Sequence, residues 1–285
     1  MKRLSLVLAI MGSTLASGLA QSVLIDVSHY GWMDQYSMNR RHNLVGNDAC
    51  VPTSTTNALT FLQNFYPTIY GTNLSGVGYT EWEDTDSALI GFMGTTAGNG
   101  TYDPQFVYGL QSYLTSINAP PVFLDGIFAG AGWGGSYPKP AFVDEGHPTT
   151  GFLFDSLSSN SALVTTISYT NGGGHGILVN GLSWDSLTNT GTLYFIDPLD
   201  PSQAYSGTTG LGPTLQTSGS LSLNEHGHLL LSYNQYQGGL PYSNNDFEMV
   251  DAVIDGALAL NPVPEPSTVL LLGLSAAVAF VRRRR

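Results

Sequence analysis

The chain has 285 residues, a formal net charge of −12 and a single cysteine, and hydrophobic residue types make up 42% of it. It is long enough to bury a sizeable core, and one cysteine excludes a fold held together by internal disulfides. The acidic excess excludes a protein that attracts nucleic acid or anionic lipid through charge.

The first twenty residues have the layout of a secretory signal peptide. Lys2 and Arg3 give a positive start, Leu4–Leu15 is mostly apolar, and small residues precede an expected cleavage after Ala20. This order is typical of a removed export signal and not of a membrane-spanning helix. We therefore expect residues 1–20 to be cleaved and the remainder to be exported.

The body is expected to span residues 21–261 as one domain and to begin with helices. A short strand at 23–27 is followed by a helix over about 52–65, because Pro52 suits the first helical position and apolar residues then recur at helical spacing. Cys50 would lie just before this helix. Three more helices and a glycine-rich loop are expected: helices at Thr85–Met93, Asp103–Ile117 and Thr149–Leu157, and the loop at Gly126–Tyr137.

The second half of the body is expected to form antiparallel strands. Runs rich in β-branched and aromatic residues are separated by turn residues such as the glycines at 172–174. Helices early and strands late indicate an α+β fold. The expected strands are Ala162–Tyr169, His175–Trp184, Thr192–Asp197, Ser220–Leu223, His228–Tyr233 and Phe247–Ile254.

The C-terminal end combines three features in order. A Pro-Glu-Pro sequence at 264–266 is followed by an apolar run, Thr268–Val281, and by four arginines, Arg282–Arg285. Fourteen helical residues reach roughly 21 Å, short of a ~30 Å hydrocarbon core, so a short transmembrane or interfacial helix is expected. Clustered basic residues stay in the cytoplasm, which orients the body outward.

These three features resemble the PEP-CTERM sorting signal of bacterial envelope proteins, over residues 262–285. The resemblance implies processing by an exosortase-type enzyme in the cell envelope. The helix would then be a temporary membrane anchor, and the mature body would be released or attached elsewhere.

The single cysteine belongs to a candidate catalytic set. A cysteine nucleophile reacts as its thiolate, which a helix N-terminus and a nearby imidazolium both stabilise. Cys50 precedes a helix, and His175 opens a strand after flexible glycines. Asp197 ends the next strand, where it would orient the His175 ring. Each residue alone is more often structural, Cys50 as a small buried side chain and Asp197-Pro198 as a turn.

The ordered set resembles the papain-like cysteine peptidases, most closely the bacterial branch that includes bacteriocin-leader peptidase domains. The resemblance rests on Cys50-Val51-Pro52 at a helix start, Gly174-His175-Gly176 on a strand, and Ile196-Asp197-Pro198. It implies a papain-like α+β fold, with N-terminal helices packed on a C-terminal antiparallel sheet. It also implies Cys50 as nucleophile, His175 as general base and Asp197 as the orienting acceptor, without a cofactor.

One position departs from that family. A glutamine about six residues before the nucleophile usually completes the oxyanion hole, and Leu44 stands there. Asn43 or Asn47 could donate instead, together with the backbone N–H of Cys50. The nearest upstream glutamine, Gln35, would need a loop to return it to the site.

Three functions remain open. The first is an exported cysteine peptidase, or a related amide-bond acyl transferase, that acts on a peptide or protein. The second is a non-catalytic binding or structural protein of the envelope or exopolysaccharide matrix. The third is a transglutaminase-like transferase, which uses the same residue types in the same order.

Two weaker patterns are expected to be solvated. His226-Gly227-His228 beside Glu225 has two potential metal ligands on one strand face but no evident third ligand. The acidic run Glu81–Asp86 fits no calcium-loop spacing and is expected to form an exposed loop. No metal or cofactor is therefore expected.

Overall fold

Six antiparallel strands close into a barrel in the computed structural model, which describes residues 20–35, 48–199, 216–236 and 247–263. Each strand pairs with the next, and the first of them pairs with both the second and the last, so closure leaves no free edge between first and last. The barrel strands are β4 (Ala162–Tyr169), β5 (Gly174–Asp185), β6 (Thr190–Ile196), β7 (Thr217–Leu223), β8 (Leu229–Tyr236) and β9 (Phe247–Pro262).

Three further strands extend the barrel sheet. β1 (Gln21–Leu24) pairs antiparallel with β5, and β2 (Val122–Phe128) pairs antiparallel with the second half of β9. β3 (Val143–Glu145) lies parallel to β2. β5 and β9 can serve several partners because they are long, at 12 and 16 residues.

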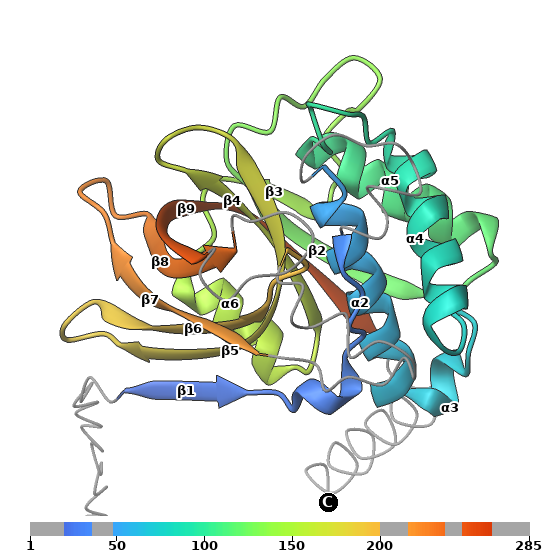
Figure 1. Ribbon diagram of the computed structural model, residues 1–285, viewed down its shortest axis with the longest axis horizontal. Coiled ribbons are helices and arrows are strands. Elements are labelled where there is room, and N and C mark those ends of the chain that lie inside the picture. Colours follow the sequence, from blue (N-terminus) through green and yellow to red (C-terminus); the bar gives the residue numbers. More distant parts are fainter. Residues whose placement is uncertain (1–19, 36–47, 200–215, 237–246, 264–285) are drawn as a thin grey trace, which may run out of the picture.

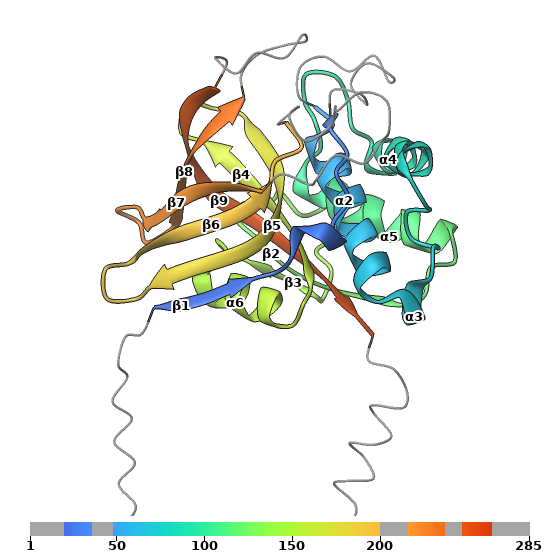
Figure 2. The ribbon, with the colours of Figure 1, turned by 60° about the horizontal axis from the view of Figure 1, so that its bottom comes forward.

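Four helices, α2 to α5, gather on one side of the barrel, whereas α6 lies apart from them against the barrel strands (Figures 1 and 2). α2 packs against β4 and β5 on one side and against α4 on the other, and α5 packs on α4. α6 packs against β4 and β5. The helices are α2 (Cys50–Phe65), α3 (Pro67–Tyr70), α4 (Tyr79–Met93), α5 (Asp103–Ser116) and α6 (Thr150–Ser158), with a 3-10 helix, η1, at Val27–His29.

α2 is buried along most of its length, from Cys50 to Gln63. Its sequence is rich in Ser and Thr, whose short side chains allow neighbouring elements to approach on both sides. Two of their hydroxyls bond within the helix, since Thr55 donates to the Val51 carbonyl at 2.7 Å and Thr60 to the Thr56 carbonyl at 2.9 Å. Thr53 and Ser54 donate to other elements, whereas the Thr56 hydroxyl has no partner among the described residues. A helix rich in Ser and Thr can therefore occupy the centre of the molecule with most of its hydroxyl donors paired.

The papain-like α+β fold expected from the sequence is wrong. The antiparallel strands close into a barrel, and the sheet takes strands from both halves of the chain, including β1 ahead of the helices and β2 and β3 between them. Closure depends on pairing between β4 and β9, for example Ala162 with Leu260. A contact between residues so far apart leaves no periodic signal in either segment.

Most of the individual elements expected from the sequence are confirmed, with shifted ends. α2 begins at Cys50 itself, and α5 and α6 lie within a residue of the expected bounds. β2 was missed, because its last three residues fall in the segment expected to be a loop.

The predicted membrane helix lies in residues 264–285, outside the described residues. In the part of the chain that is described, none of the helices combines the length and the apolar character that crossing a membrane requires.

Candidate functional site

Cys50 is the first residue of α2. The Ala49 N-cap makes no side-chain hydrogen bond to the helix, so the amide groups of the first turn are left uncapped by a side chain. Such a helix start favours an anion. The turn before it is held by Asp48, whose Oδ2 accepts a hydrogen bond from the Gly98 N–H at 2.9 Å. Cys50 is only 6% exposed.

His175 and Asp197 form a buried pair on neighbouring strands. His175 is the second residue of β5, and Asp197 follows the end of β6, which pairs with β5. His175 Nε2 lies 2.7 Å from Asp197 Oδ1. The same oxygen accepts a hydrogen bond from the Leu199 N–H at 2.9 Å, which orients the carboxylate.

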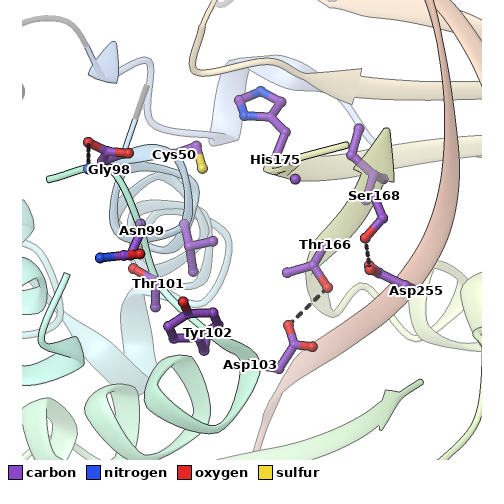
Figure 3. A pocket seen from close by; sticks show the side chains of 16 residues that line it. Cys50, Gly98, Asn99, Thr101, Tyr102, Asp103, Thr166, Ser168, His175 and Asp255 are labelled. Carbon is purple, nitrogen blue, oxygen red and sulfur yellow. Dashed lines mark hydrogen bonds between the residues drawn. The ribbon is translucent and has the colours of Figure 1, made fainter. Parts of the chain in front are cut away.

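Close packing of α2 on β5 brings Cys50 to His175. The Ser54 hydroxyl donates to the Gly176 carbonyl at 2.9 Å, directly beside His175. A Cβ at Gly176 would lie 2.8 Å from Val51 Cγ2 and 3.0 Å from Val51 Cα, so only glycine permits this approach. Figure 3 shows Cys50 and His175 on facing sides of one pocket.

The surroundings of the His175 ring favour its charged form. Burial lowers the pKa of His175, but Tyr169, Asp197 and a hydrogen bond with the Cys50 thiol outweigh burial and raise this pKa well above its usual value. Burial also raises the pKa of Tyr169, whose ring stacks on His175 at 6.4 Å. Tyr169 is therefore neutral near pH 7. We infer that the negative charge that stabilises the imidazolium is that of Asp197.

The pocket in front of Cys50 and His175 has a volume of about 470 Å³. Its walls come from the start of α2, the loop at 98–102 that leads into α5, and strands β4 and β9. Asp103 and Asp255 lie on this wall beyond Thr166 and Ser168 (Figure 3). Burial, and then the charge of Asp255, raises the pKa of Asp103 to about 7.

Of the three residues considered as oxyanion-hole donors, only Gln35 belongs to the described part of the chain. Asn43 and Asn47 lie outside the described residues. Gln35 is fully buried, and its backbone N–H donates to the Pro198 carbonyl at 3.0 Å, which puts it beside Asp197. Neither its Nε2 nor its Oε1 has a hydrogen-bond partner among the described residues. The contact between Gln35 and Pro198 joins residues far apart in the sequence, so no local pattern could predict it.

The histidine pattern and the acidic run, both expected to be solvated, have different surroundings in the structure. His226 is exposed and lies 3.5 Å from Glu225, whereas the His228 ring stacks on His147 with centroids 3.5 Å apart. No group of three potential metal ligands occurs within the described ranges. The acidic run is not a loop but part of α4, and its last residue, Asp86, is fully buried. The expectation that Glu81–Asp86 forms an exposed loop was therefore wrong.

Comparison with known proteins identifies the end of the chain. Residues 262–285 match the PEP-CTERM protein-sorting motif. A search of curated proteins finds no match. The comparisons give no support to the resemblance between the body and papain-like cysteine peptidases. By its C-terminal motif, the chain is an exported protein that an exosortase-type enzyme sorts to the cell envelope.

Proposed function

We propose that the body is a cysteine-dependent enzyme that cleaves or transfers amide bonds of peptides outside the cytoplasm. The observation that carries this proposal is the buried His175–Asp197 pair, 2.7 Å apart, in hydrogen-bonding contact with Cys50 at an uncapped helix start. A raised His175 pKa supplies an imidazolium at neutral pH, and an imidazolium beside a thiol stabilises the thiolate. The pocket of about 470 Å³ admits part of a peptide chain.

The reaction follows from the positions of these atoms. The Cys50 thiolate adds to the amide carbonyl carbon, and the C–N bond then breaks as the His175 imidazolium gives its proton to the leaving nitrogen. The product on the protein is a thioester. Water next attacks the thioester while His175 accepts its proton, which releases the carboxylic acid and restores the Cys50 thiolate and the His175 imidazolium; an amine in place of water gives transfer. Asp197 is a positioning residue that keeps the ring oriented.

The negative oxygen formed in the first step needs hydrogen-bond donors. The backbone N–H of Cys50 lies at the uncapped start of α2, where the helix dipole favours negative charge. Gln35 is the second donor in this proposal, because its backbone lies beside Pro198 and its buried side-chain amide has no partner among the described residues. A buried amide left unpaired costs about 1–3 kcal/mol, a cost that a function at this position would explain.

The proposal predicts a reactive Cys50 at neutral pH. The rate of Cys50 alkylation by iodoacetamide is measured by mass spectrometry from pH 4 to 10, in the full-length chain and in His175→Ala. The wild-type protein should react well below pH 7. In His175→Ala the onset should move toward about pH 8.5, where a free thiol ionises. His226→Ala removes an exposed histidine and should leave the wild-type profile unchanged.

Turnover is then sought with a peptide mixture, in which cleavage must disappear in Cys50→Ala. If Cys50 reacts only after the protein unfolds, the thiol is a core side chain and the proposed enzyme does not exist. The alternative, a non-catalytic binding or structural protein of the envelope or exopolysaccharide matrix, would then account for the fold and the sorting motif.

A further inference from the structure

Two carboxyl groups share the pocket with Cys50 and His175 and lack a basic partner. Lys139 is the single lysine or arginine in the described part of the chain, and it lies 3.9 Å from Glu145. The Asp255 Oδ2 accepts a hydrogen bond from Ser168. Its Oδ1 is shielded from solvent and has no hydrogen-bond partner among the described residues.

Asp103 is the second carboxyl group of the pair and lines the same pocket. It is the first residue of α5, and its Oδ1 accepts a hydrogen bond from Thr166 Oγ1 at 3.2 Å. Figure 3 shows both hydrogen bonds and both carboxyl groups on the same side of the pocket. Because burial and Asp255 raise the pKa of Asp103 to about 7, the two groups repel each other as that carboxyl ionises.

A β-bulge sets the position of Asp255. Thr166 pairs with Gly256 and Ile167 pairs with Ile254, so the register shifts and Asp255 has no residue opposite it. A bulge of this kind redirects a side chain and recurs next to active sites. Only glycine at position 256 leaves room for the Thr166 side chain, since a Cβ there would lie 2.2 Å from Thr166 Oγ1.

The spacing between the carboxyl pair and the nucleophile suits a long side chain. Ile167 pairs with His175 on one side and with Ile254 on the other. The Asp255 backbone is therefore two strand spacings, about 10 Å, from that of His175. A substrate residue bound near Cys50 would span the gap with an extended stem such as that of lysine or arginine.

We propose that Asp103 and Asp255 bind a positively charged group of the substrate, a lysine or arginine side chain close to the amide bond that Cys50 attacks. The inference rests on the proposed function. A cation between the two carboxylates replaces their repulsion with two charge-assisted hydrogen bonds. The surrounding charge favours the same substrates, because residues 21–261 contain 20 acidic and three basic residues.

The test compares two peptide chloromethyl ketones that differ only in lysine or norleucine next to the reactive carbon. In both, the thiolate sulfur displaces chloride and forms a C–S bond, so both report on Cys50. Rates are measured at pH 8 on the full-length chain by mass spectrometry. The lysine probe should react about tenfold faster or more, the discrimination expected of a hydrogen bond to a charged group. Asp255→Asn and Asp103→Asn should each bring the ratio of the two rates toward one.

Asp251→Asn is the matched control, because Asp251 lies on the same strand, is exposed and also accepts a hydrogen bond from a serine, Ser232. It should keep the wild-type ratio. A ratio near one in the wild-type protein overturns the inference and leaves the proposed enzyme standing, since both probes still modify Cys50. A ratio that persists in both Asn variants also overturns it. If neither probe nor iodoacetamide modifies the folded protein, the proposed function and this inference fall together.

Discussion

At the scale of single residues, Asp86 ties the first turn of the nucleophile's helix to the helix beside it. Its Oδ2 accepts a hydrogen bond from Thr53 Oγ1 at 2.8 Å, three residues after Cys50. Burial raises the pKa of Asp86 well above its usual value; the Thr53 hydrogen bond opposes this increase, and the charges of Asp34 and Glu83 add to it. The folded protein therefore keeps a proton on Asp86 that the unfolded chain releases.

This proton makes the free energy of unfolding depend on pH. Because the folded-state pKa is raised, the stability that Asp86 allows is complete below the ordinary pKa of 3.8 and is lost as the pH rises toward the folded-state value. The loss is at most about 1.4 kcal/mol for each pH unit. Asn cannot ionise, so Asp86→Asn should become progressively more stable than the wild-type protein between pH 5 and pH 8.

Urea unfolding at several pH values measures the difference. Asp84→Asn, on the same helix but exposed, serves as the control and should change the curve little. Parallel wild-type and Asp86→Asn curves would show that Asp86 does not retain its proton in the folded protein.

At the scale of elements, the packing of α2 on β5 determines whether the candidate site forms at all. The helix carries Cys50 and the strand carries His175, and Gly176 is the point of closest approach. Two of the atoms that a Cβ at Gly176 would meet, Val51 Cα at 3.0 Å and Val51 N at 3.1 Å, belong to the backbone. They cannot turn aside as a flexible side chain would.

Gly176→Ala should therefore separate α2 from β5. Overpacking of this kind costs about 1–3 kcal/mol in the free energy of unfolding. It should also slow alkylation of Cys50 at pH 6, because His175 would stabilise the thiolate less. Gly91→Ala is the matched control, since no atom lies within 4 Å of the added Cβ on α4 and a helical Gly→Ala change is stabilising by up to about 1 kcal/mol. Equal alkylation rates in the two variants would contradict the role given to Gly176.

At the scale of the whole molecule, the folded body and the sorting motif meet at one residue. β9 ends at Pro262, which pairs with Val122 of β2, and the PEP-CTERM match begins at the same position. The body therefore completes its sheet at the residue where the motif begins. Processing of the tail can remove the motif without taking a strand from the barrel.

Replacing Pro264, Glu265 and Pro266 with alanine should block this processing. In a host that carries an exosortase-type enzyme, the variant should retain its tail and accumulate with a larger mass than the wild-type product, as measured by mass spectrometry. Its melting temperature should not change, because these residues follow the last barrel strand. Leu271→Val keeps the motif and the apolar run and should be processed normally. A mature mass in the alanine variant would show that the Pro-Glu-Pro sequence does not direct processing.

Features encoded by neighbouring residues were predictable from the sequence. The sorting motif, the helices around Pro52 and Pro104, and all six barrel strands except the second half of β9 can be read in this way, because capping and side-chain periodicity act over a few positions. It also singled out Cys50, His175 and Asp197, although their role stays a prediction.

The way these elements combine could not be predicted from the sequence. Pairing of β4 with β9 closes the barrel, a contact with Pro198 returns Gln35 to the site, and a bulge turns Asp255 into the pocket. The papain-like fold was wrongly expected for the same reason. Each of these features depends on contacts between residues distant in the chain, whose energy comes from packing and hydrogen bonding that neither segment records alone.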